Sequence, residues 1–442
     1  MPENSKSDIG EFKISLERRS EIEKEIKSIP DLKKTVEGSL TENISEFIET
    51  IFGGAIFLDA SDIHIETEES QVKIRLRTDG VLQDAATISR KLYESILSRI
   101  KLVSGIKLNI IDRPQDGRFS VLLEEKDGKE SIEIRVSTLP SEHGESVVLR
   151  VLNPKSLIDL NALGLREDLL TIFKKEIKKP NGMIMVTGPT GSGKTTTLYA
   201  FLKTIQSAEI KIITIEDPIE YHLEGISQTQ VRPDKGYDFA SGLQSIMRQD
   251  PDVILVGEIR DSKTCQIALQ AALTGHLVFS TLHTNDATGT VARLMVLGAD
   301  LANIGPAINL AIAQRLVRNV CDNCKELKTI SPLVLEKIKK DLRGMPKEVK
   351  FPKLTKDSKI PQAKGCKHCN FTGFRGRIGI FEVILMDDEM EKFLLKNPSS
   401  GAFREEAIKK GMVTMYQDGL IKVLEGTTTL EEVERVTGGE NK

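Results

Sequence analysis

The spacing of hydrophobic residues changes at about residue 40, and this change predicts where folded structure begins. The first 40 residues are rich in charge, and only Ile22, Ile26 and Ile29 form a short helical stripe. We therefore expect a charged N-terminal arm or small subdomain outside any core. The sequence Ser39-x-x-Glu42 is a capping box, and the apolar residues after it have the spacing of one helical face. A folded domain is expected to start there.

Apolar and polar residues then alternate, which predicts antiparallel strands with one face buried. The first such runs are 62–66 and 72–77, and the turn signal Thr-Asp-Gly at 78–80 closes the second. A helix is predicted over 90–104 to pack on this sheet. Three further strands complete a small α/β domain, at 119–123, 132–136 and 147–151.

The middle of the chain changes to short, continuous apolar runs separated by glycine-rich turns and helices. Such runs are typical of parallel strands covered on both faces, and they predict a doubly wound α/β nucleotide-binding domain. The runs are 183–187, 212–215, 253–256 and 277–280. The predicted organisation is an arm at 1–40, an α/β domain at 41–154, a linker at 155–180, a nucleotide-binding core at 181–320, a four-cysteine subdomain at 321–380 and a helical region at 381–442.

Composition and charge narrow the possible functions. The 442 residues include 62 Lys+Arg and 65 Asp+Glu, a net charge of −3, which disfavours a protein that coats nucleic acid by charge alone. No apolar run approaches a membrane span and the start lacks the features of a signal peptide, so a cytoplasmic protein is expected. Residues 325–364 carry 11 lysines and one arginine against five acidic residues, which predicts a solvated, partly mobile insertion.

The most specific motif fits G-x-x-x-x-G-K-[ST] and lies between an apolar strand and a helix. Glycine N–H groups close around phosphate oxygens, Lys194 reaches the β and γ phosphates, and the Thr195 hydroxyl ligates Mg²⁺. The motif therefore predicts ATP binding with Mg²⁺. The expected nucleotide-binding residues here are Gly188, Pro189, Thr190, Gly191, Ser192, Gly193, Lys194, Thr195 and Thr196.

Hydrolysis also needs an acid near the metal and a group that positions water, and two strand ends supply candidates. Glu258 is expected to polarise the attacking water, with Glu216 second in line, although the sequence does not order them. Gly257 stands where a usual Walker B motif has its metal-binding Asp. His276 and His283 flank another strand, and each could sense the γ-phosphate through a hydrogen bond, although a lone histidine is more often structural.

Four of the five cysteines form two C-x-x-C pairs, which is enough for a closed tetrahedral Zn²⁺ site. The pairs are separated by 41 residues, more than is usual, and the lysine-rich insertion accounts for the difference. A redox disulfide is the alternative, and His368 inside the second pair is expected to be a bystander. Cys265 has the spacing of a small core residue on a helix. The expected zinc ligands are Cys321, Cys324, Cys366 and Cys369.

These motifs, taken in order over about residues 40–440, resemble the type II secretion and type IV pilus assembly ATPases. In that family, the Walker B motif also has Gly before Glu, and assembly-type members carry a similar cysteine knuckle. The resemblance therefore implies a RecA-like P-loop domain preceded by a smaller PAS-like α/β domain. The blocks that carry the resemblance are 61–66, 113–118, 213–220, 248–261, 274–286 and 365–382.

The resemblance further implies a hexameric ring that hydrolyses ATP to drive secretion or pilus assembly at an inner-membrane platform. Arg135 and Arg150, by local motif, would complete the ATP site of a neighbouring domain, which makes hydrolysis depend on domain closure. Arg248 and Arg260 resemble further nucleotide-facing arginines. The enzyme would be cytoplasmic and peripheral to the inner membrane, with ATP, Mg²⁺ and Zn²⁺ as cofactors and no nucleic-acid partner.

Two other functions remain open at this stage. A nucleic-acid translocase can use the same nucleotide fold, because the phosphate loop does not distinguish motors by cargo, and the lysine-rich insertion favours this alternative. A nucleotide-gated assembly protein with little turnover is the other, disfavoured by the presence of Glu258 and the arginines. The sequence does not decide between secretion and pilus assembly.

Overall fold

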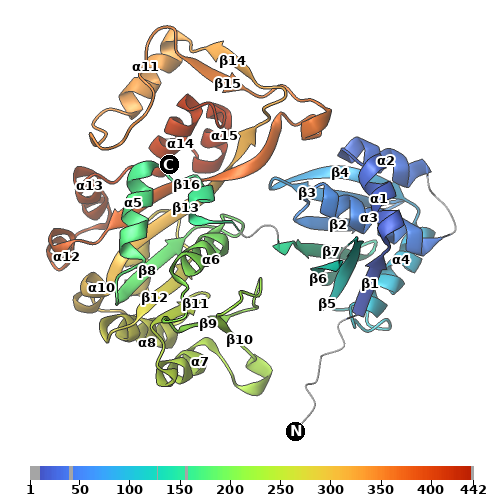
Figure 1. Cartoon of the computed structure of the whole chain (residues 1–442), viewed down its shortest axis with the longest axis horizontal. Coiled ribbons are helices and arrows are strands. Elements are labelled where there is room, and N and C mark those ends of the chain that lie inside the picture. Colours follow the sequence, from blue (N-terminus) through green and yellow to red (C-terminus); the bar gives the residue numbers. More distant parts are fainter. Residues whose placement is uncertain (1–9, 39–42, 127, 155–157, 440–442) are drawn as a thin grey trace. The chain divides into compact units, whose positions relative to one another are not determined.

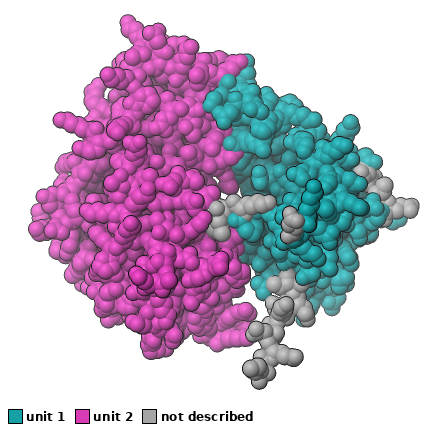
Figure 2. All heavy atoms as spheres, in the orientation of Figure 1, with its two compact units in different colours: residues 1–155, 321–325, 363–375 teal, residues 156–320, 326–362, 376–442 magenta. Residues whose placement is uncertain are grey.

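A computed structural model describes residues 10–38, 43–126, 128–154 and 158–439. The chain divides into two compact units, each described by itself below (Figure 2). The N-terminal unit comprises residues 1–155 with the short segments 321–325 and 363–375, and the C-terminal unit comprises 156–320, 326–362 and 376–442. Among the described residues, no helix combines the length and apolar character needed to cross a bilayer.

The N-terminal unit is a seven-stranded sheet with helices α1 to α4 gathered on one face (Figure 1). Its strand order is β1-β5-β6-β7-β2-β3-β4, antiparallel except for the parallel pair β1 and β5. The predicted turn holds Asp79 and Gly80 at positive φ and joins β3 to β4. The elements are β1 (Gly10–Ile14), α1 (Leu16–Glu25), α2 (Ile29–Gly38), α3 (Ile44–Phe57), β2 (Asp62–Thr67), β3 (Val72–Thr78), β4 (Val81–Ile88), α4 (Arg90–Val103), β5 (Gln115–Glu125), β6 (Gly128–Ser141) and β7 (Gly144–Leu152).

The expectation that the first 40 residues form an arm outside the core is wrong for residues 10–38. Strand β1 extends the sheet, and Ile22, Ile26 and Leu32 are at most 2% exposed in the same core as the sheet. The apolar stripe is divided between two short helices, so counting at a single helical period detects only part of it. The predicted capping box at 39–42 lies outside the described residues, and the side chain of Asn43 caps α3.

The C-terminal unit is built on a second seven-stranded sheet, ordered β10-β9-β11-β12-β8-β13-β16. Alternate residues of β8 belong to different hydrophobic clusters, Met183 and Met185 to one and Ile184 and Val186 to the other, so both faces of the sheet are covered, as the continuous apolar runs predict. The strands are β8 (Gly182–Thr187), β9 (Ile212–Glu216), β10 (Ser227–Gln230), β11 (Val253–Val256), β12 (Leu277–Leu282), β13 (Ile308–Val320) and β16 (Phe374–Leu385). The helices around this sheet are α5 (Glu167–Glu176), α6 (Lys194–Ile205), α7 (Phe239–Ile246), α8 (Ser262–Leu273), α9 (Gly289–Val296) and α10 (Leu301–Ala307).

Two predicted boundaries differ from the structure. The linker range 155–180 contains helix α5, whose Phe173 is fully buried in the C-terminal unit, so its described part is not a free connection. The range 321–380 is not one subdomain, because its cysteine segments belong to the N-terminal unit and residues 326–362 to the C-terminal unit.

The lysine-rich insertion is folded rather than merely solvated. Leu335 and Ile338 are at most 4% exposed, and Ile338 belongs to the core of the C-terminal unit. The lysines of the insertion are exposed, whereas the apolar side chains of Leu335 and Ile338 are buried. The high lysine content alone therefore does not reveal that the insertion has a buried side. The insertion contains β14 (Glu326–Thr329), α11 (Pro332–Asp341) and β15 (Lys359–Gln362), and the C-terminal helices follow as α12 (Asp388–Leu394), α13 (Ser400–Lys409), α14 (Met415–Leu424) and α15 (Leu430–Thr437).

A buried ion cluster fixes the last helix to the sheet and gives a pH prediction. Glu432 is 2% exposed, and its carboxylate accepts hydrogen bonds from Arg318 Nε at 3.0 Å and Arg435 Nε at 2.8 Å. Burial would raise the pKa of Glu432, but the bonds from Arg435 and Arg318 prevail and hold it at about 2. Because the folded pKa is depressed, the stabilisation is present above pH 4.5 and is lost as the pH falls toward 2.

We therefore expect Glu432→Gln to lower the free energy of unfolding at pH 7 by on the order of 2–3 kcal/mol. The difference from the unmodified chain should shrink by about 1 kcal/mol or more between pH 7 and pH 3.5, measured by urea denaturation. Glu431→Gln, one residue earlier on the outer side of α15, is the matched control. A difference that is the same at both pH values would contradict this assignment.

Candidate ATP site and metal centre

The phosphate loop connects β8 to α6 in a conformation that only glycine fits at two positions. Gly188 has φ 151° and Gly193 has φ 89°. A Cβ atom at Gly188 would lie 2.5 Å from Ser192 Oγ, and one at Gly193 would lie 2.8 Å from Gln314 Nε2. The loop therefore presents its backbone directly at the amino end of α6, where N–H groups favour an anion.

Polar groups within the loop fit a bound phosphate chain. Lys194 Nζ donates to the carbonyl oxygens of Gly188 at 2.8 Å and Pro189 at 3.1 Å, and burial lowers the pKa of Lys194. Ser192 Oγ is buried and has no hydrogen-bond partner among the described residues. Thr195 is exposed in the first turn of α6, where its hydroxyl is available to a metal ion. The residues present thus fit a nucleotide with Mg²⁺.

Glu258 follows β11 and lies in a cluster of charged and titratable groups. Its carboxylate is 2.5 Å from Arg260 Nη2 and 3.7 Å from His283 Nε2, and the side chain is 13% exposed. Burial, with the charge of Lys194, lowers the pKa of His283. The structure thus brings together four predicted site residues, Lys194, Glu258, Arg260 and His283, and favours the neutral imidazole at pH 7.

Glu216 has different surroundings, which separate its role from that of Glu258. It is 3% exposed, and its carboxylate accepts hydrogen bonds from Tyr199 Oη, from Thr214 Oγ1 at 2.5 Å and from Gln228 Nε2 at 3.2 Å. Burial raises the pKa of Glu216. Three protein donors already occupy its oxygens, so Glu216 is better suited to holding β9, β10 and α6 together than to activating water.

The glycine of the unusual Walker B motif lies against the neighbouring strand. Gly257 N donates to Ile215 O at 2.8 Å. A Cβ atom at Gly257 would lie 3.3 Å from Ile215 O and 3.4 Å from Glu216 Cα, a tight contact with backbone. Close strand packing thus favours glycine where the usual motif has Asp.

His276 does not lie near the phosphate loop, contrary to its predicted nucleotide contact. It precedes β12, and its carbonyl oxygen accepts from Gly182 N, at the amino end of β8, at 3.2 Å. Its ring Nδ1 lies 3.1 Å from Ala271 O. His283 follows the other end of β12, and a strand of this length separates the two histidines by about 20 Å.

Arg248 also lies at the amino ends of the parallel strands. It is exposed at the end of α7 and donates to Ser245 Oγ at 3.2 Å. The adjacent Gln249 carbonyl accepts from Lys211, which precedes β9. The predicted contact between Arg248 and nucleotide is therefore wrong for the phosphate loop of the same chain, which lies at the carboxyl ends.

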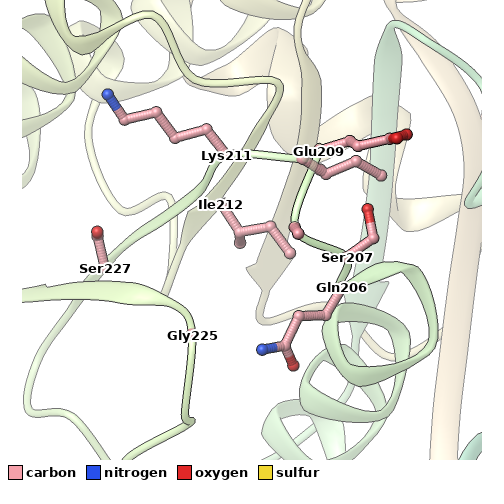
Figure 3. A pocket seen from close by; sticks show the side chains of 9 residues that line it. Gln206, Ser207, Glu209, Lys211, Ile212, Gly225 and Ser227 are labelled. Carbon is pink, nitrogen blue, oxygen red and sulfur yellow. The ribbon is translucent and has the colours of Figure 1, made fainter.

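A hollow of about 520 Å³ opens at this amino edge, beside the C-terminal end of α6 (Figure 3). Helix α6 separates it from the phosphate loop by about 18 Å. It is therefore distinct from the nucleotide site. Its lining residues are Gln206, Ser207, Ala208, Glu209, Ile210, Lys211, Ile212, Gly225 and Ser227.

Two neighbouring residues of β13 contribute to the site and were missed by the motif search. Gln314 Oε1 accepts from Thr197 Oγ1 in α6 at 2.7 Å. Arg315 Nη2 donates to Asn285 O, in the loop after His283, at 3.1 Å. Gln314 and Arg315 thus connect α6, which follows the phosphate loop, to the loop after His283. The only sequence signal is a polar pair that interrupts an otherwise apolar strand.

Arg135 and Arg150 lie directly opposite each other on β6 and β7 of the N-terminal unit. Arg150 Nε is 3.3 Å from Asp62 Oδ1, and Arg135 Nε is 3.6 Å from Glu133 Oε1. The structure therefore brings the two predicted arginines together on one sheet face.

The four paired cysteines converge on one point of the N-terminal unit. Their sulfur atoms all lie within 4.8 Å of one another, and three pairs are separated by 3.8–3.9 Å. Zinc–sulfur bonds of about 2.3 Å in a tetrahedron place sulfur atoms about 3.8 Å apart, so the arrangement fits Zn²⁺. The members are Cys321, Cys324, Cys366 and Cys369.

Contacts around this cysteine cluster support a metal rather than a disulfide. All five cysteines are free thiols, and the N–H groups of Cys366 and Gly373 donate to Cys369 Sγ. His368 contacts Arg375 and lies outside the cluster, as expected. Cys265 is fully buried in the core, and burial raises the pKa of its thiol to about 11.

The cysteine cluster also contacts helix α2 within the same unit. Asn370 Oδ1 accepts a hydrogen bond from Ile29 N at 2.7 Å, and Lys367 Nζ is 3.1 Å from Asp31 Oδ1. Segments more than 300 residues apart in sequence are thus neighbours here.

Comparison with known proteins identifies related sequences. The Type II/IV secretion system protein family matches residues 38–435. The type II secretion system ATPase E of Vibrio cholerae is 45% identical over 412 residues, covering 92% of this chain and 78% of that protein. The type IV pilus assembly ATPase PilB of Thermus thermophilus is 40% identical over 392 residues, covering 88% of this chain and 42% of that protein.

Solved structures agree on the fold. The ATPase DotB of Legionella pneumophila has a TM-score of 0.62 at 21% identity, covering 88% of this chain and 94% of that one. The pilus retraction motor PilT with bound ADP has a TM-score of 0.55 at 26% identity, covering 87% of this chain and 95% of that one.

Proposed function

Because the chain belongs to the Type II/IV secretion system protein family, we propose that it is a Mg²⁺-dependent, hexameric ATPase motor that drives protein secretion or pilus assembly at the inner membrane. The observation that carries this proposal is the meeting of the phosphate loop with Glu258 and His283 at one edge of the sheet. The related motor PilT was solved with ADP bound, which supports nucleotide binding by this chain.

The roles of the residues follow from their surroundings. Loop N–H groups and Lys194 hold the β and γ phosphates, and Thr195 would hold Mg²⁺, which neutralises phosphate charge when bound. Glu258 polarises the attacking water, and His283, kept neutral by its lowered pKa, donates a hydrogen bond without adding charge. Glu216 holds β9 and β10 in position against α6 through its hydrogen bonds.

Arg135 and Arg150 serve the site of another subunit in this proposal. Guanidinium groups stabilise the charge that develops on the transferred phosphoryl group, so hydrolysis requires both arginines to reach the ATP site. Such dependence on closure is what couples hydrolysis to movement. Zn²⁺ held by the four cysteines has a structural role, since all four positions of a tetrahedral site are then occupied by protein.

The named relatives are secretion and pilus ATPases, so the nucleic-acid translocase is not favoured. The proposed partners are further copies of the chain and inner-membrane platform proteins, with the enzyme in the cytoplasm. ATPase activity should require Mg²⁺, rise with a platform protein and remain unchanged by DNA or RNA. Stimulation by nucleic acid that weakens steeply with salt would overturn the proposal.

A cross-linked pull-down from native membranes tests the partner. Recovery of a polytopic platform protein is expected, and its neighbours would decide between secretion and pilus assembly. Recovery of nucleic acid without any such protein would contradict the proposed role.

A further inference from the structure

Four arginines and one aspartate form a line across the sheet of the N-terminal unit. The register of β5, β6, β7, β2 and β3 sets each of them directly opposite the next. We call this line the arginine row. Its members, in order, are Arg118, Arg135, Arg150, Asp62 and Arg77.

The arginine row lies on the face of the sheet that points away from the unit's core. One neighbour of the row in each of the five strands is fully buried: Phe119, Ile134, Leu149, Ile63 and Leu76. Successive side chains of a strand point to opposite faces, so the row points away from α1 to α4 (Figure 1). Arg118 and Arg150 are exposed.

The row concentrates positive charge at a cost to stability. Like charges directly opposite each other on adjacent strands repel, and two such arginine pairs follow one another here. The row itself holds four guanidinium groups and one carboxylate, and a second carboxylate, that of Glu133, lies 3.6 Å from Arg135 Nε. A second line of paired residues lies two positions along each strand from the arginine row and passes through His64 and Arg75. This second line has an aspartate at each end, Asp116 and Asp84. The charge excess thus belongs to the arginine row.

Asp62 bridges two members of the row. Its Oδ1 is 3.3 Å from Arg150 Nε and its Oδ2 is 3.4 Å from Arg77 Nε. The Asp62 side chain is 10% exposed, whereas that of Arg150 is 53% exposed. Arg150 can therefore turn toward an incoming anion while Asp62 keeps Arg77 as its partner.

We propose that the arginine row is one binding surface for the polyphosphate chain of a nucleotide, with Arg118 as a further phosphate contact. Asp62 is the counter-ion that phosphate displaces from Arg150, and Arg77 is a positioning residue that retains Asp62 after displacement. Guanidinium forks match phosphate oxygens, and strand spacing sets Arg118, Arg135 and Arg150 about 10 Å across. The inference rests on the proposed function in that it assumes nucleotide contact by Arg135 and Arg150.

Pyrophosphate binding to the full chain carrying Lys194→Ala tests this inference without hydrolysis, because the phosphate loop is disabled. Titration calorimetry should show pyrophosphate binding that weakens with salt. Adding Arg118→Gln or Arg77→Gln should weaken it at least about threefold, and adding Asp62→Asn should tighten it by a similar factor, since Arg150 is freed. Arg75→Gln, two residues before Arg77 and paired with Glu66, is the matched control.

The outcomes separate this inference from the proposed function. If the Lys194→Ala chain does not bind pyrophosphate, the arginine row is not a binding surface. The same conclusion follows if the Arg118→Gln and Asp62→Asn variants bind pyrophosphate with the same affinity as the Arg75→Gln control. Lack of Mg²⁺-dependent ATPase activity in the unmodified chain would instead overturn the proposed function. Asp62→Ser repeats the charge removal with a smaller side chain, and thermal melting confirms that each variant is folded.

Discussion

Glu258→Gln should reduce the rate of ATP hydrolysis by at least about 100-fold while leaving ATP binding nearly unchanged. The amide keeps the size of the side chain but cannot polarise water as a carboxylate does. Glu258 lies beside His283 and Arg260, close enough to the phosphate loop for its charge to act on Lys194. Turnover would be measured as phosphate release, and binding with a fluorescent ATP analogue.

Glu216→Gln is the matched comparison, because both changes remove one carboxylate at a strand end. We expect a loss of less than about tenfold in turnover, since three protein groups rather than water surround Glu216. The two variants together decide which of the two carboxylates, Glu258 or Glu216, activates water, a question that the sequence leaves open. A larger loss for Glu216→Gln than for Glu258→Gln would reverse the assigned roles.

One Zn²⁺ per chain is expected in the purified protein, and Cys369→Ser should abolish it. Structural zinc contributes about 10–16 kcal/mol in small zinc peptides, so its loss should unfold the cysteine segments. Because Asn370 and Lys367 contact α2, we also expect amide hydrogen exchange in α2 to accelerate by at least about tenfold. Metal content would be measured by atomic emission, and exchange by mass spectrometry.

Cys265→Ala is the control for that experiment, since Cys265 is buried in the C-terminal unit and far along the chain from the cysteine pairs. It should leave the zinc content at one per chain and the exchange of α2 unchanged. Cys369→Ser protein that retains one zinc, or purified chain with linked cysteine pairs and no metal, would contradict the assignment.

The elements that could be predicted from the sequence are those whose signal is local. The phosphate loop could be predicted because its glycines, lysine and threonine are contiguous, and the strands because their apolar spacing is regular. The four cysteines were found by their spacing, and the structure confirms that they converge. The place of Glu258 beside His283 follows from parallel strands whose carboxyl ends share an edge.

The remaining features depend on pairing between distant segments. His276 and His283 look equivalent in the sequence, yet one strand length separates them. Gln314 and Arg315 act through β13 lying next to β8, an adjacency that no motif records. The arginine row likewise exists only through strand register. Charge along the first 40 residues concealed a strand and two helices because each contributes only part of an apolar face.

The contact of α2 with the cysteine cluster also has a consequence for biosynthesis. The N-terminal unit begins with β1, but it includes Lys367 and Asn370, so it lacks part of its structure until those residues leave the ribosome. At 5–20 residues per second, the interval after residue 155 is made is roughly 10–40 s. During this time α2 has no cysteine segment to contact. Capture of zinc at the proposed site, which needs both cysteine pairs, would thus be among the last steps in completing the unit that is made first.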